Sequence, residues 1–227
     1  YYEDNVAFTK AISDYINDNN TLFKIRDSIL YSHILYERRE YIEELLNLYE
    51  NGSHMIFTSC VPSFIEGVFH DLCLVFGYDN NELLSEGFQK KVDKLKENLG
   101  HHLCYEYYIF YFRLLRNRVA HGQVKGSEIA GLAHILLLDM EHITSLVNLE
   151  TIPYNYKLFV LNELEKNINT PNYKYLMKFV LMDKVVIPDY YNVTKERNEA
   201  IYDLLKTQEF WGFIDHELEY DSPTVKH

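Results

Sequence analysis

The amino-acid sequence predicts an all-α protein, built as an antiparallel helical bundle with helical extensions at both ends. Long segments place apolar residues three and four positions apart, which is the spacing of one face of a helix. The 227 residues include only five prolines and nine glycines, few for the many turns of an all-β protein. The content of 47% hydrophobic and 25% charged residues is ordinary for a folded domain with one core.

The first part of the chain, residues 1–50, is expected to form a helical extension. Residues 3–17 have the pattern of a short amphipathic helix, which Asp18-Asn19-Asn20 ends. Thr21 suits the cap of the next helix, because its hydroxyl can accept from a free backbone N–H. One long helix is then predicted from Leu22 to Tyr49.

Residues 51–150 are expected to form the core of the bundle. Helices are predicted over residues 54–76, 82–99, 102–120 and 127–149, and the last of these has the most regular apolar spacing. The link from Gly122 to Gly126 is short, so the last helix should run antiparallel to the one before it.

Residues 151–227 are expected to form a C-terminal helical extension. Three helices are predicted, over residues 158–168, 173–182 and 195–216, with breaks near Pro171 and Pro188. This part carries no recognisable catalytic pattern, which favours a packing or docking role.

Charge and cysteine content limit the classes of function. A net charge of -12 argues against a protein that coats nucleic acid non-specifically, but not against an enzyme that draws RNA into a small positive cleft. Cys60, Cys73 and Cys104 are widely spaced and form no C-x-x-C pair, which favours a reducing cytoplasm. No apolar run reaches the roughly 18–20 residues of a membrane span, so no membrane association is expected.

A cluster of cations stands out near the middle of this acidic chain. Arg113, Arg116 and Arg118 fall within six positions, at the end of an aromatic helical stretch, and Gly122 suits the residue that ends the helix. One interpretation is a solvent-exposed helix end whose arginines complement the helix dipole.

The residues in and after the cluster also suit cleavage of RNA by its own 2′-hydroxyl without a metal. The fork of Arg116 can bind two phosphate oxygens and stabilise the charge on phosphorus. His121 can exchange a proton near neutral pH. Asn117 can orient an imidazole or a hydroxyl through its amide.

The run Arg116-Asn117-x-x-x-His121-Gly122 resembles the Arg-x4-His signature of the HEPN superfamily, in the form with a polar residue after the arginine. The resemblance implies a small all-α bundle and a metal-independent endoribonuclease that leaves 2′,3′-cyclic phosphate and 5′-hydroxyl ends. It implies catalytic roles for Arg116, Asn117 and His121, an RNA substrate, no cofactor and a composite site at a homodimer interface. Toxin and anti-phage defence settings are typical of such proteins.

Other residues are expected to support this site. Arg113, Arg118, Lys125 and Ser127 are candidates for binding RNA phosphates, Ser127 because a helix N-terminus favours an anion. Glu66 is a candidate partner of the arginines behind the site.

No metal site is expected. Glu66 and His70 lie four residues apart, the spacing of an ordinary polar contact on a helix. His101 and His102 lie near Cys104, but no fourth ligand follows at a familiar spacing.

Helix geometry bears on how the site assembles. Five residues separate Arg116 from His121, which places them about 140° apart on a straight helix. Convergence on one phosphate then needs a helix end at His121 or a second copy of the motif, and the resemblance implies the second.

Two alternatives to a nuclease remain open. One is a non-catalytic HEPN-like module that dimerises or binds nucleotide or RNA, and the other is a helical scaffold with a chance motif. The chain begins with Tyr rather than Met, and we expect a longer polypeptide with an additional domain, or a partner such as an activator or antitoxin.

Overall fold

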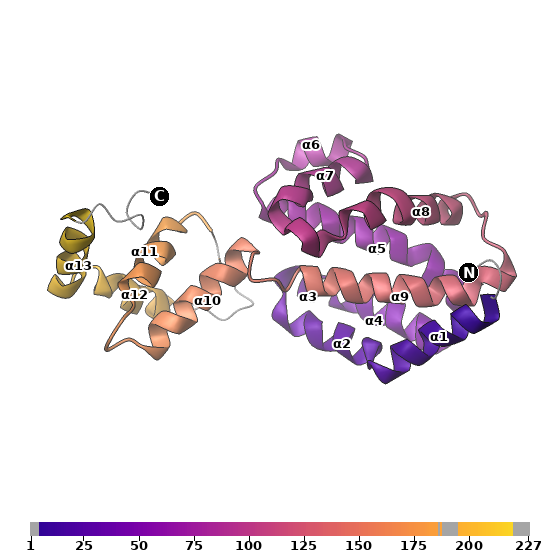
Figure 1. Ribbon diagram of the computed structural model, residues 1–227, viewed down its shortest axis with the longest axis horizontal. Helices are drawn as coiled ribbons and strands as arrows, with labels where there is room; N and C mark the ends of the chain where they lie inside the picture. The colour runs from indigo at the N-terminus through magenta and orange to yellow at the C-terminus, as the bar shows by residue number, and fades with distance from the viewer. Residues whose placement is uncertain (1–4, 186, 188–194, 220–227) are drawn as a thin grey trace. The chain divides into compact units, whose positions relative to one another are not determined.

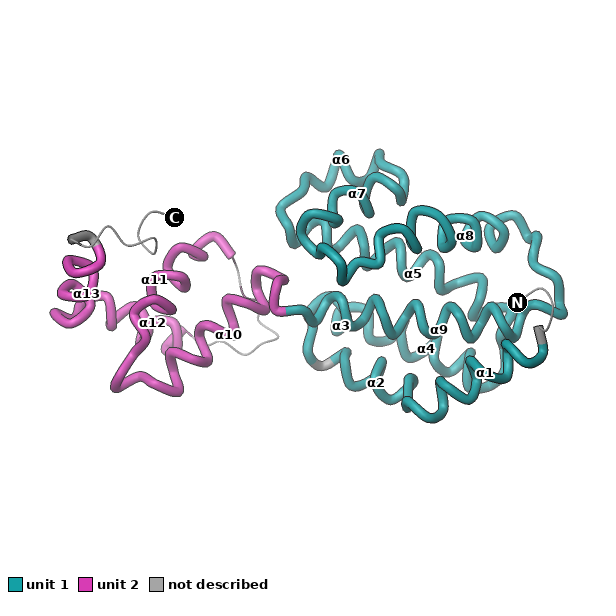
Figure 2. Tube along the Cα trace, in the orientation of Figure 1, with its two compact units in different colours: residues 1–149 teal, residues 150–227 magenta. Residues whose placement is uncertain are grey.

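A computed structural model describes residues 5–185, 187 and 195–219 of the chain. Within these residues every regular element is a helix, with thirteen α-helices and no strand, which confirms the predicted all-α class (Figure 1). The chain divides into two compact units, Tyr1–Leu149 and Glu150–His227 (Figure 2).

The first unit is built around two long helices that pack against each other, α5 (His54–Val75) and α9 (Ile129–Leu146) (Figure 1). Both are apolar over much of their surface, and both are covered by shorter helices. On α9 lie α1 (Asn5–Asp18) and α2 (Thr21–Ser28). On α5 lie α4 (Arg39–Glu50) and α7 (Phe88–Leu99). Three helices before residue 50, α1, α2 and α4, therefore pack directly on the two central helices, and the predicted three-part division of the chain stays a prediction.

The long helix predicted from Leu22 to Tyr49 is wrong. The segment instead forms α2, a 3-10 turn over Ile29–Tyr31, α3 (His33–Glu37) and α4. Ser32 adopts an extended backbone, and the turns at this residue and at Arg38 change the chain direction. Leu35 of α3 and Ile42 of α4 are both fully buried, and long-range packing overrides the helical spacing here.

Two contacts join this segment to the central helices. The guanidinium of Arg38 pairs with Asp71 of α5, with Nη2 and Oδ2 2.7 Å apart, and covers Gly67, where a Cβ would meet it at 3.0 Å. Thr21 does not cap α2 as predicted. Its hydroxyl instead donates to Glu141 Oε2 of α9 at 3.1 Å, while Asn20 precedes the helix in a left-handed conformation.

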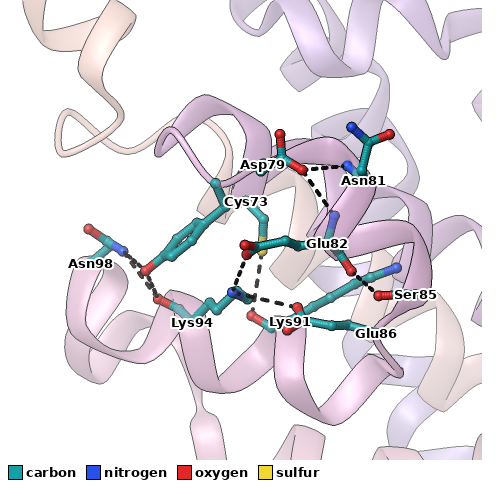
Figure 3. A network of polar contacts seen from close by, with 10 residues as sticks. Cys73, Asp79, Asn81, Glu82, Ser85, Glu86, Lys91, Lys94 and Asn98 are labelled. Carbon is teal, nitrogen blue, oxygen red and sulfur yellow. Dashed lines mark hydrogen bonds and ion pairs between the residues drawn. The ribbon is translucent and has the colours of Figure 1, made fainter.

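The helix predicted over residues 82–99 is two helices, α6 (Asn80–Ser85) and α7. The carboxylate of Asp79 caps α6 by accepting from the backbone N–H groups of Asn81 and Glu82 at 2.9 and 3.1 Å (Figure 3). Lys94 of α7 lies 3.6 Å from Glu86 in the link between the two helices. A strong local cap therefore begins a helix two residues before its predicted start.

The second unit contains α10 (Pro153–Lys166), α11 (Tyr173–Leu181), α12 (Lys195–Leu204) and α13 (Gln208–Glu219). It has an apolar cluster of its own, which includes Val160, Leu164 and Phe179. The single helix predicted over residues 195–216 is wrong, because a turn at residues 205–207 divides it. The break predicted at Pro188 lies outside the described residues.

Candidate functional site

The helix predicted over residues 102–120 begins at Tyr105 and contains a π-helical stretch. Gly100–Leu103 forms a 3-10 turn, Cys104 is left-handed with φ 50°, and Tyr107–Phe112 forms a π-helical segment before α8 (Arg113–Ala120). The wider π-helical turn lets both Tyr107 and Tyr108 reach α9. Their hydroxyls lie 2.9 Å from Asp139 Oδ2 and 2.8 Å from His142 Nδ1, respectively.

The end of α8 agrees with the sequence. Gly122 has φ 65°, and its N–H donates to the Val119 carbonyl at 3.0 Å. The N–H of Gln123 donates to the Arg118 carbonyl at 2.8 Å, which completes a Schellman motif. Gly122 is therefore the C′ residue, as predicted, and His121 is the last residue with near-helical geometry.

Arg116 points from α8 toward α5. Its Nη2 lies 2.7 Å from Glu66 Oε2, and the two side chains are 35% and 25% exposed. Glu66 thus makes the contact with an arginine that the sequence analysis expected. The catalytic and supporting roles of the pair stay predictions.

The other two arginines of the cluster are also engaged. Arg113 Nη1 donates to Gln89 Oε1 of α7 at 2.8 Å, and Arg118 Nη2 lies 2.7 Å from Glu128 Oε2. Glu128 also accepts from the backbone N–H of Lys125 at 3.3 Å. Neither Gln89 nor Glu128 is among the residues predicted from the sequence. No spacing rule identifies Gln89, but the expected antiparallel turn after Gly122 brings Glu128 within reach of Arg118.

Asn117 and His121 are exposed, and in the described part of the chain neither side chain has a hydrogen-bond or ion-pair partner. With Arg113 they lie on one stripe of α8, four residues apart each. Because α8 stays regular through Ala120, Arg116 and His121 leave the helix about 140° apart. One copy of the chain thus brings Arg113, Asn117 and His121 to one face and directs Arg116 to another.

The remaining two candidates lie after the motif. Lys125 and Ser127 are both exposed, and Ser127 belongs to a 3-10 turn, Gly126–Glu128. The helix predicted from residue 127 begins at Ile129. It runs antiparallel to the motif segment, as expected, since Arg118 pairs with Glu128 near its start and Tyr107 bonds Asp139 further along.

Large apolar side chains border the exposed stripe. Phe110 and Leu114 are 65% and 61% exposed, and Tyr111 is also exposed, whereas Tyr108 and Phe112 are fully buried. Part of the aromatic stretch therefore packs the core, and part remains open beside Asn117 and His121.

A search of the described residues finds no group of three or more His, Cys, Asp or Glu side chains placed to hold a metal ion. His70 Nε2 lies 3.0 Å from Asn80 Oδ1, while Glu66 is turned to Arg116. The three cysteines are free thiols, and burial raises the pKa of Cys73 to about 12.

The sequence matches no protein-family model, and neither the curated proteins nor the solved structures contain a significant match. The likeness to HEPN proteins accordingly stays an interpretation of the motif.

One segment, Gly126–Leu146, is long and apolar enough to cross a membrane, with a mean hydropathy of 1.3. However, 56% of the 18-residue stretch that meets this test is buried within the protein, and a core helix has the same properties. This is weak evidence in either direction, and the cytoplasmic localisation stays a prediction.

Proposed function

We propose that the first unit is a HEPN-like bundle and that the protein is a metal-independent endoribonuclease, acting as a toxin or in anti-phage defence. The observation that carries the proposal is the pair of exposed side chains, Asn117 and His121, that have no partner in the described part of the chain. They lie at a helix end whose geometry Gly122 sets. Arg116, on another face of the same helix, is held by an ion pair with Glu66.

The reaction would proceed through the RNA's own 2′-hydroxyl. One histidine, His121, exchanges the proton, taking it from the 2′-hydroxyl or giving it to the leaving 5′-oxygen. Asn117 orients the imidazole or the hydroxyl, and Arg116 binds the charge that grows on the phosphate oxygens. The products would carry 2′,3′-cyclic phosphate and 5′-hydroxyl ends.

A second copy of the chain would complete the site. Because Arg116 and His121 leave α8 in different directions, two copies of the motif that face each other would bring an arginine and a histidine to one phosphate. The apolar side chains of Phe110 and Leu114 lie beside the motif and suit the middle of such an interface.

The direct test is cleavage of a labelled single-stranded RNA and of a tRNA pool in excess EDTA. The wild type should cut and leave cyclic-phosphate ends, and both His121→Ala and Arg116→Ala should abolish cutting. Lys90→Ala, which removes an exposed cation of α7 outside the motif, should cut like the wild type. Cutting that survives both motif substitutions would overturn the proposal.

One observation favours a second candidate function, a non-catalytic module that dimerises or binds nucleotide or RNA. All three arginines of the cluster already bind protein side chains, namely Gln89, Glu66 and Glu128. A carboxylate held on Arg116 competes with a phosphate for the same fork. RNA or nucleotide binding without cleavage by any form would favour this function.

A further inference from the structure

A cavity of about 390 Å³ that is open to solvent lies between α1 and the start of α9. Lys10 and Ser13 of α1 line one side, and Ser127, Gly131 and His134 line the other. A water molecule occupies about 30 Å³ of liquid, so a phosphate group and several waters fit. Among the described residues that line the cavity there is one cation, Lys10, and no carboxylate.

His134 supplies the strongest sign of a ligand. Its side chain is only 9% exposed, and Nδ1 lies 2.6 Å from the hydroxyl of Tyr49. Burial raises the pKa of Tyr49 to about 12, so this phenol keeps its proton. In the described part of the chain the Tyr49 hydroxyl has no other acceptor, and we therefore assign it as the donor to Nδ1.

That hydrogen bond sets the tautomer of His134. With Nδ1 as the acceptor, the ring proton of the neutral imidazole lies on Nε2. Among the described residues Nε2 has no partner, and the ring forms part of the cavity wall. An N–H group in the wall of this cavity can donate to a ligand that enters it.

The other donors around the cavity suit an anion. Lys10 is exposed and makes no ion pair with any described residue. Ser127 offers a hydroxyl in the 3-10 turn that leads into α9, at the end of the helix where the dipole favours negative charge.

We propose that this cavity binds one phosphate group through Lys10, Ser127 and His134 Nε2. The Arg118–Glu128 ion pair joins the turn that carries Ser127 to the end of α8, so the cavity lies next to the motif. If the proposed ribonuclease function holds, on which this part rests, the group is a phosphodiester of the RNA strand beside the cut. The alternative source is the phosphate of a free nucleotide.

The first measurement is titration with inorganic phosphate, followed through the ring nitrogen signals of His134 by NMR. We expect a saturable shift of these signals in the wild type. Lys10→Gln should weaken binding about tenfold, because it removes a charge-assisted hydrogen bond. Ser127→Ala should weaken it less, and Lys90→Gln should bind as the wild type does.

The ligand source is tested with a nucleoside 5′-monophosphate and a 2′-O-methyl oligonucleotide that has no free 2′-hydroxyl to react. Stronger binding of the oligonucleotide, weakened by Lys10→Gln, supports the RNA strand, and stronger binding of the monophosphate supports a nucleotide. No saturable shift of His134, or equal affinity of Lys10→Gln and the wild type, overturns the site. The titration measures binding and requires no RNA cleavage. A negative result therefore rejects the phosphate site without testing the proposed nuclease activity.

Discussion

Arg116 Nη2 and Glu66 Oε2 lie 2.7 Å apart, and this contact links the motif helix α8 to the central helix α5. Both side chains are partly exposed, so the pair contributes only about 0–1 kcal/mol to stability. Its main effect is on the orientation of Arg116, because the Glu66 carboxylate restricts the guanidinium to one conformation.

We predict that Glu66→Ala lowers RNA cleavage roughly ten- to hundredfold, since a misplaced phosphate-binding group is costly in rate. The free energy of unfolding should fall by less than about 1 kcal/mol. Single-turnover cleavage and urea denaturation measure the two effects.

The control for this prediction is the same substitution in an Arg116→Lys background, which keeps the charge but loses the planar fork that Glu66 orients. If Glu66 acts by orienting that fork, the double variant should be no worse than Arg116→Lys alone. An additional loss in the double variant would show that Glu66 acts by another route.

The fold class and the motif's helix end follow from local rules. Helical spacing along the chain predicts the all-α class, and one glycine after a run of helix formers predicts the Schellman motif at Gly122. The cap at Asp79 is also a local feature, and attention to it predicts the start of α6.

The predictions that fail do so because contacts between residues far apart in the sequence decide the local structure. Arg38 binds Asp71, 33 residues away, where the predicted long helix breaks. The π-helical segment bonds through Tyr107 to Asp139, 32 residues away. The spacing of apolar residues carries no information about either contact. For the same reason, the hydrogen bond between Arg113 and Gln89 in the site could not be predicted.

A composite site predicts complementation between two inactive variants. In a mixed dimer of Arg116→Ala and His121→Ala, one of the two sites receives an intact arginine and an intact histidine. Equal amounts of the two chains should therefore recover about a quarter of wild-type cleavage after re-equilibration. No recovery, in mixtures shown by native mass spectrometry to contain mixed dimers, would contradict a site shared in this way.

The exposed apolar face beside the motif predicts a self-association surface. Leu114→Asp should shift the protein toward monomer in sedimentation equilibrium and reduce cleavage in parallel, because a charge is costly to bury at an interface. Leu114 is already 61% exposed, so the fold itself should be unaffected. Leu84→Asp is the matched control, since Leu84 is 70% exposed on α6, away from the motif helix. An unchanged dimer in Leu114→Asp would place the interface elsewhere.

The backbone of Gly122 predicts a conformational effect. Gly122→Ala should lower the free energy of unfolding by about 1 kcal/mol, because a Cβ is unfavourable at φ 65°. No atom lies within 4 Å of the added Cβ, so no steric clash contributes. Gly126→Ala also meets open space, without a positive φ, and should be neutral or slightly stabilising. Equal effects of the two substitutions in thermal unfolding would contradict this interpretation.

Asp139 predicts a pH dependence of stability. It is only 7% exposed, and burial raises its pKa to about 7 despite the hydrogen bond from Tyr107. In the unfolded chain the pKa is about 3.9. Between these values the folded state holds a proton that the unfolded state has lost. This carboxyl therefore lowers the free energy of unfolding as pH rises from about 4 to 7, by on the order of 1 kcal/mol per pH unit.

The substitution that isolates this effect is Asp139→Asn, which keeps an oxygen to accept from Tyr107. His134 and His142 act in the opposite sense, because burial lowers their pKa values and stability falls as pH drops through about 6.5, the unfolded value. The wild-type profile alone can consequently be flat. The free energy of unfolding of both proteins is measured by urea denaturation from pH 4.5 to 7.5. Subtracting the wild-type profile from the Asp139→Asn profile largely cancels the contribution of the two histidines. The remaining difference should grow with pH. Parallel profiles would mean that Asp139 is ionised in the folded protein throughout this range.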